Sequence, residues 1–175
     1  SLKINKDLPS TGSTDIDEVR LLDAHGRAVT NVGSGEALTV LIQLTIEQPL
    51  VDPHLGVAIF REDGAYCSGP NTRFDGLQFA RLDPGSYECR LAFESLPLTP
   101  GRYRLSVALW DAPESSPYAY HQAVYPLEIT GPAAEGVVVL DHTWHQLPSS
   151  SPQGGEPTLS VSGRLDHQAW WRTFE

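Results

Sequence analysis

Apolar and polar residues alternate with a period of two along much of this chain. The clearest stretch is residues 37–47, where one face is entirely aliphatic and the other is polar except for Leu41. The aliphatic positions are Leu38, Val40, Ile42, Leu44 and Ile46. Successive side chains of a strand point to opposite faces, so this period predicts a half-buried β-strand.

Further strands are predicted between turn signals along the rest of the chain. Gly64 accepts the positive φ of a tight hairpin turn, and Pro100 with Gly101 marks another turn. The predicted strands cover residues 17–22, 37–47, 56–61, 65–69, 87–94, 102–110, 118–129 and 136–144, with a short addition within 158–165. Short strands at this spacing, without helical periodicity, predict an all-β fold in the form of an antiparallel β-sandwich.

The length of the chain, 175 residues, fits one domain with tails and is sufficient for a core without disulfides. Residues 1–15 are polar and are predicted to be a linker or a lead-in strand, and residues 16–145 hold the sandwich. Residues 146–175 are predicted to be a flexible linker followed by a tail without assignment. Cys67 and Cys89 are expected to be reduced thiols, with a disulfide left open if their strands are neighbours.

The net charge argues against polyanionic partners. The chain has 12 Lys and Arg residues against 22 Asp and Glu, which gives a net charge of −10, whereas contacts to phosphates need clustered cations. Nucleic acid and anionic membrane surfaces are therefore not expected as partners. No apolar run approaches the ~18 residues of a membrane span, and no secretory signal opens the chain.

Motifs for catalysis or cofactor binding are missing from the sequence. There is no P-loop and no Gly-x-Ser-x-Gly nucleophile motif. Asp141, His142 and His145 are close in sequence, but residues three apart on a strand point to opposite faces, which disfavours a metal site. Glu88 and Glu94, which a glycosidase would need in a close pair, are expected to be solvated surface carboxylates. No enzyme, cofactor or metal is therefore predicted.

Aromatic side chains on an exposed sheet face suggest a binding function instead. A sugar ring has an apolar C–H face, which an exposed Trp or Tyr can cover while nearby polar groups bind the hydroxyls. Trp110 lies on the outward register of the strand 102–110, beside small residues that would leave a shallow trough. The expected glycan-binding residues, from this strand and from the strands before and after it in sequence, are Trp110, Arg104, Ser106, Arg90, Tyr120 and Gln122. The open alternative is that Trp110 packs under the loop 112–117.

An ordered set of short motifs gives the predicted strands a family resemblance. The set spans residues 17–144 and runs Val57-Ala58-Ile59-Phe60-Arg61, Asp63-Gly64, Gly69-Pro70-Asn71-Thr72, Asp75-Gly76, Pro84-Gly85, Leu96-x-Leu98-x-Pro100-Gly101-x-Tyr103, Leu105-Ser106-Val107, Asp111 and a closing strand that ends in Trp144. This set resembles the C-terminal carbohydrate-binding domain of Wzt-type ATP-binding subunits of ABC transporters that export O-antigen polysaccharide.

The resemblance implies an immunoglobulin-like β-sandwich with a C-terminal strand swapped between the two chains of a homodimer. Residues 136–144 match that strand, and residues 130–135 match its tether. The implied function is non-catalytic recognition of the non-reducing end of a lipid-linked O-antigen polysaccharide, coupled to export. The implied partners are this polysaccharide, a transmembrane subunit and an upstream ATP-binding domain of the same protein, on the cytoplasmic side of the inner membrane. Family binding residues vary with the glycan, so Asn71 and Thr72 are expected only to brace their loop.

Two other functions remain open from the sequence. One is a structural or adhesive β-sandwich whose sheet face binds protein and no glycan, and the other is a hydrolase. Recognition of an acidic end group would need guanidinium groups. The available candidates are Arg73, Arg90, Arg102 and Arg104.

Overall fold

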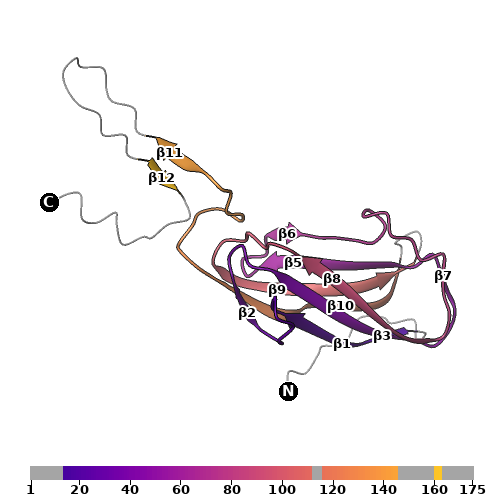
Figure 1. Cartoon of the computed structure of the whole chain (residues 1–175). Coiled ribbons are helices and arrows are strands. Elements are labelled where there is room, and N and C mark those ends of the chain that lie inside the picture. The colour runs from indigo at the N-terminus through magenta and orange to yellow at the C-terminus, as the bar shows by residue number, and fades with distance from the viewer. Residues whose placement is uncertain (1–13, 112–115, 146–159, 163–175) are drawn as a thin grey trace, which may run out of the picture.

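The computed structural model describes residues 14–111, 116–145 and 160–162, and every regular element among them is a β-strand (Figure 1). The strands are β1 (Thr14–Leu22), β2 (Asn31–Gly33), β3 (Leu38–Ile46), β4 (Leu50–Val51), β5 (His54–Arg61), β6 (Tyr66–Ser68), β7 (Arg81–Leu82), β8 (Gly85–Phe93), β9 (Gly101–Trp110), β10 (Pro117–Thr130), β11 (Thr143–His145) and β12 (Ser160–Ser162). The predicted all-β class is confirmed. Within the described ranges, no helix is long and apolar enough to cross a membrane.

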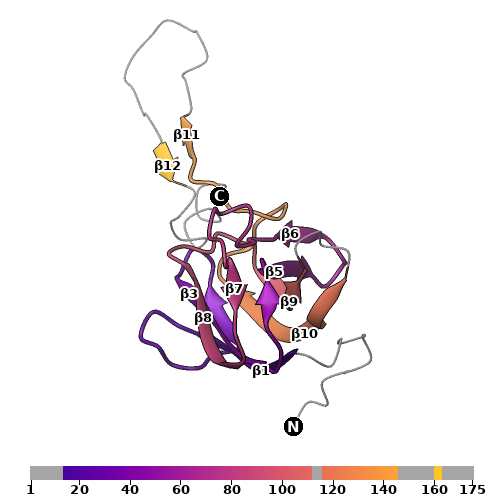
Figure 2. The same cartoon turned by 90° about the vertical axis from the view of Figure 1, so that its right-hand side faces the viewer.

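Two sheets form the sandwich. One has the strand order β1-β3-β8 and the other has the order β2-β10-β9-β5-β6, and Figures 1 and 2 show them packed face to face. The hairpin β5–β6 was predicted, and Gly64 in its turn has a φ of 88°. One pairing departs from the antiparallel prediction, because the short strand β2 lies parallel to the end of β10. Neither β2 nor β4 was predicted, since both are too short to show alternation.

The core lies between the two sheets and follows the predicted alternation. The five aliphatic residues of β3 that share one face are each 2% exposed or less. Opposite them, β9 contributes Tyr103, Leu105, Val107 and Leu109, each 1% exposed or less. Because these four point inward, the residues between them point to the outer face of the five-stranded sheet, where Arg104 is exposed. The predicted register of β9 is therefore confirmed.

The predicted strand 136–144 is wrong over most of its length. Its first residues are held by backbone hydrogen bonds to the turn before β9, from Thr99 N to Val137 O (3.0 Å) and from Val139 N to Pro97 O (2.7 Å). These partners belong to a turn and not to a sheet, so an apolar sequence here does not produce a strand. Strand structure begins only at β11, which pairs with β12 and projects away from the sandwich in Figure 1.

The strands extend to both sides of the predicted sandwich, and part of the predicted linkers lies outside the described residues. Residues 14 and 15 belong to β1, which agrees with the lead-in strand of the two alternatives for residues 1–15. Within the predicted tail, β12 falls inside the stretch 158–165, whereas the linker 146–157 lies outside the described residues. Cys67 and Cys89 are free thiols in different sheets, and burial raises the pKa of Cys89.

Candidate ligand-binding site

A cavity of about 160 Å³ lies on the outer face of the five-stranded sheet. Its floor is made of small residues from two paired strands. Gly56 of β5 is in register with Ala108 of β9, and Ala58 is in register with Ser106. Four small residues side by side leave a depression in the sheet surface, which larger side chains at the same positions would fill.

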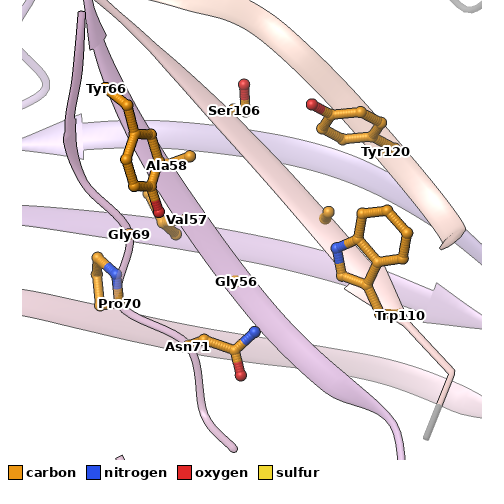
Figure 3. Close-up of a pocket in the computed structure, with 11 residues that line it drawn as sticks. Gly56, Val57, Ala58, Tyr66, Gly69, Pro70, Asn71, Ser106, Trp110 and Tyr120 are labelled. Carbon is orange, nitrogen blue, oxygen red and sulfur yellow. The ribbon is translucent and has the colours of Figure 1, made fainter. Parts of the chain in front are cut away.

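Aromatic side chains form the walls of this cavity (Figure 3). Trp110 stands at the end of β9, and Tyr120 of β10 lies beside it with ring centroids 6.0 Å apart and ring planes at 44°. Tyr66 of β6 closes the opposite side. Gly69 leaves room for Tyr66, because a Cβ at this position would overlap the Tyr66 hydroxyl. The cavity thus combines three aromatic rings with a flat floor.

The segment after β6 completes the rim by running along the free edge of β5. Val57 N donates to Pro70 O (3.0 Å), and Thr72 N donates to Leu55 O (2.9 Å). The Thr72 side chain also accepts a hydrogen bond from Leu55 N (3.0 Å). The Asn71 Oδ1 atom accepts from Arg73 N (2.8 Å). The predicted bracing role of Asn71 and Thr72 is confirmed, and Asn71 also lines the cavity.

An irregularity in β10 positions a polar group in the floor. The pairing of β10 with β9 shifts register between His121 and Tyr125, and Ala123 within this stretch has a φ of 48°. Its backbone N–H donates to the Ser106 Oγ atom (2.7 Å), which is buried within the sheet surface. Bulges of this kind often lie beside functional sites because they redirect side chains. Gln122, which lies within this bulge, is exposed to solvent and does not line the cavity.

The structure brings together three of the six predicted site residues. Trp110, Ser106 and Tyr120 line the cavity, whereas Arg104 lies on the same face but outside the lining. The placement of Arg90 beside them is wrong, because its strand β8 belongs to the other sheet. The chain crosses between sheets at the turn before β9, so β8 and β9 are consecutive in sequence but do not pair.

Several lining residues were missed because they come from the β5–β6 hairpin and the segment that follows it. They are Gly56, Val57, Ala58, Tyr66, Gly69, Pro70 and Asn71. The alternation of Gly56 and Ala58 with larger apolar residues was a usable signal, since two small residues on one face of a strand indicate a depression. Pairing of β5 with β9 was not visible from the sequence.

The cavity is uncharged, and its surroundings do not suggest catalysis. None of the described residues that line it carries a formal charge. Glu88 lies on the other sheet and accepts a hydrogen bond from Arg90 (2.7 Å), which lowers the pKa of this carboxyl. A glycosidase acid needs the opposite shift. Across the described ranges, no three His, Cys, Asp or Glu side chains gather in a way that would hold a metal.

A second cavity of about 330 Å³ opens between the two sheets at the β5 and β8 edges. Leu55 and Leu91 line it from these two strands, and Phe79 lines it from the segment after β6. Arg90 and Glu88 line this second cavity and belong to the sheet opposite to the one that carries the predicted trough.

Two comparisons with known proteins bear on this architecture. The solved structure described as the C-terminal domain of wzt superposes with a TM-score of 0.64 at 16% sequence identity, covering 81% of this chain and 84% of that one. This likeness supports the fold. In sequence, the chain is 29% identical over 152 residues to the O-antigen export system ATP-binding protein RfbB of Myxococcus xanthus. The match covers 86% of this chain but only 33% of the relative, so the chain spans about a third of that protein.

A family model gives the most direct assignment. The model described as the Wzt C-terminal domain matches residues 5–140, which include both sheets of the sandwich and every residue of the aromatic cavity. The chain therefore belongs to the Wzt C-terminal domain family.

Proposed function

We propose that this chain is a non-catalytic glycan-recognition domain that binds the non-reducing end of a lipid-linked O-antigen polysaccharide. The observation that carries the proposal is the shallow cavity with aromatic walls and a floor of small residues. A pyranose ring placed there would set its C–H face against Trp110 or Tyr120 and its hydroxyls against Ser106 and Asn71. The cavity is smaller than the ~300–1,000 Å³ of drug-sized ligand sites, which suits one terminal sugar residue.

The relative from Myxococcus xanthus suggests the context in which such a domain works. That protein is named as an ATP-binding protein of an O-antigen export system, and it extends well beyond the matched part. We infer that this domain accompanies an ATP-binding domain of the same protein and a transmembrane subunit, at the cytoplasmic face of the inner membrane. Binding of the glycan end would then report to the transporter that a finished polymer is present.

Titration with the source organism's own O-polysaccharide tests the proposal. We expect saturable binding in the micromolar to millimolar range, because sugar hydroxyls exchange water hydrogen bonds for protein bonds at little net gain. Calorimetry or chemical-shift changes in NMR spectra would measure it. An absence of binding to this polysaccharide would favour the structural or adhesive alternative, and release of reducing ends would favour a hydrolase.

We further propose that the chain forms a homodimer in which the segment 136–144 crosses to the partner's sheet. Leu140 and Trp144 are 73% and 70% exposed in the single chain, although both are large and apolar. Among the described strands, β8 ends its sheet and has one edge without a strand partner. An unpaired edge and an exposed apolar segment are the two halves of a strand exchange.

The double variant Leu140→Ser/Trp144→Ser tests this dimer. We expect its dimer dissociation constant to rise at least tenfold, because serine removes the apolar surface that the exchange would bury. Light scattering after size-exclusion chromatography would measure the mass across a concentration series. Phe74→Ser is the matched control, since Phe74 is 78% exposed in another loop. A variant that dimerises like the parent chain would exclude this segment from the interface.

A further inference from the structure

We propose that the aromatic cavity recognises an acyl carbonyl, so that the bound end residue is an N-acetylated, uncharged amino sugar. This inference rests on the proposed function and names the class of sugar that the cavity selects. It follows from the direction of two N–H donors above Gly56, from the lack of charged residues in the lining and from the small size of the cavity.

The first donor is the side-chain amide of Asn71. Its Oδ1 atom is occupied by the hydrogen bond from Arg73 N (2.8 Å), which fixes the orientation of the amide group. The Nδ2 atom is thereby directed over Gly56, where a Cβ added to the glycine would lie 3.4 Å from it. Figure 3 shows the amide nitrogen on the side of the open floor. Among the residues that the structure describes, none accepts a hydrogen bond from this nitrogen.

The second donor is the indole N–H of Trp110. Figure 3 shows the Nε1 edge of the ring turned toward the floor between Gly56 and Ser106, on the far side of Gly56 from Asn71. An indole nitrogen can donate a hydrogen bond but cannot accept one. None of the described residues accepts a hydrogen bond from it. The two donors thus face a common space that a glycine keeps open.

A ligand that displaces water from this space must supply an acceptor. Leaving a donor unpaired after desolvation costs about 1–3 kcal/mol, so two such donors discriminate strongly between ligands. A carbonyl oxygen has two lone pairs and can accept from both N–H groups at once. A hydroxyl oxygen is a weaker match, because it also brings a proton that needs its own acceptor.

The remainder of the cavity fits the other parts of an N-acetyl sugar. The acetyl methyl group would rest on the apolar floor of Ala58 and Ala108, and the pyranose ring would lie against Tyr120. An unacetylated amino sugar carries an ammonium group, and the described lining offers no carboxylate to pair with it. A carboxylate or phosphate end group would likewise find no cation in the lining, since Arg104 lies outside it.

Binding of simple glycosides to the intact chain tests the inference. The probes are the methyl glycosides of N-acetylglucosamine and N-acetylgalactosamine, with glucose, galactose and glucosamine as matched controls. We expect the N-acetyl sugars to bind at least tenfold more tightly than their parent hexoses and than the free amine. Chemical-shift titration followed by NMR is suited to the millimolar affinities that single sugars give.

Two conservative variants locate the preference at the proposed donors. Trp110→Phe keeps an aromatic ring and removes the N–H group, and Asn71→Asp keeps the acceptor for Arg73 N while replacing the amide donor. Each is expected to reduce the preference for N-acetyl sugars over their parent hexoses to less than threefold, whatever the change in overall affinity. A preference that survives in both variants would overturn the inference.

The polysaccharide itself separates this inference from the proposed function. The source organism's O-polysaccharide is titrated before and after alkaline N-deacetylation, and we expect affinity to fall at least tenfold after the treatment. Equal binding of both forms would overturn the acyl-carbonyl inference and leave glycan recognition intact. Failure of both forms to bind would overturn the proposed function and the inference together.

Discussion

Replacement of Trp110 by alanine is expected to weaken glycan binding by about 30-fold or more. Aromatic residues at the centre of a binding site commonly contribute about 2 kcal/mol or more when truncated, and ~1.4 kcal/mol corresponds to a tenfold change in affinity. Trp110 forms one wall of the cavity, and its ring packs against the ring of Tyr120. Its removal deletes the stacking surface and lets water into the floor. Calorimetric titration of the O-polysaccharide would measure the change.

The control for this variant is Phe74→Ala. Phe74 is an exposed aromatic residue that does not line the cavity, so its truncation is expected to leave glycan affinity within twofold. Circular dichroism and thermal unfolding establish that both variants keep the fold. If Trp110→Ala and Phe74→Ala bound the polysaccharide equally well, the cavity on the five-stranded sheet would not be the glycan site.

The same experiment tests the alternative that Trp110 packs under the loop 112–117. Residues 112–115 of this loop lie outside the described residues, and truncation of Trp110 tests whether its side chain packs under the loop. The two interpretations differ in outcome. If Trp110 only supports the loop, its truncation lowers the stability of the domain and leaves glycan affinity unchanged. If Trp110 binds sugar, its truncation lowers glycan affinity and leaves the stability of the domain unchanged.

Local patterns predicted the strands well, and the reason is visible in β3 and β9. Each turns alternate large apolar side chains toward the opposite sheet, and this packing imposes a period of two on the sequence. The same logic placed Ser106 and Trp110 on one outer face correctly. It failed at 136–142, where apolar residues contact a turn and the backbone never enters a sheet.

Strand order limited how much of the site could be predicted. Alternation shows which way a side chain points but not which strand lies beside it. Arg90 was therefore assigned to a neighbour of β9, although β8 pairs with β3. The true neighbours of β9 are β10, which follows it directly in sequence, and β5, which lies about 50 residues before it. The pairing with β5 brings Gly56 to the site, together with Asn71, which bridges to Gly56.

Tyr103 is expected to be among the most costly positions to truncate for stability. Its side chain is 1% exposed, and its hydroxyl donates to Thr99 O (2.7 Å), four residues upstream. This arrangement is similar to the tyrosine corner of immunoglobulin-like sandwiches, in which a Tyr hydroxyl bonds the backbone a few residues upstream. Tyr103→Ala leaves a large cavity in the core and is expected to lower the free energy of unfolding by about 3–5 kcal/mol, a large share of the ~5–15 kcal/mol of a typical domain.

Tyr103→Phe separates the ring from the hydroxyl. The phenylalanine keeps the packing and loses the hydrogen bond, so we expect a smaller loss of about 1–2 kcal/mol, measured by urea unfolding at equilibrium. The hydroxyl also lies 3.1 Å from Thr99 Oγ1, which in turn donates to Gly136 O (3.1 Å). By binding Thr99 O, the Tyr103 hydroxyl holds the residue whose side chain and backbone N–H bind Gly136 O and Val137 O. Loss of the hydrogen bond to Thr99 O is therefore expected to loosen the start of the segment 136–144. If Tyr103→Phe were as stable as the parent chain and exchanged the amide hydrogens of residues 137–139 at the same rate, Tyr103 would act through packing alone.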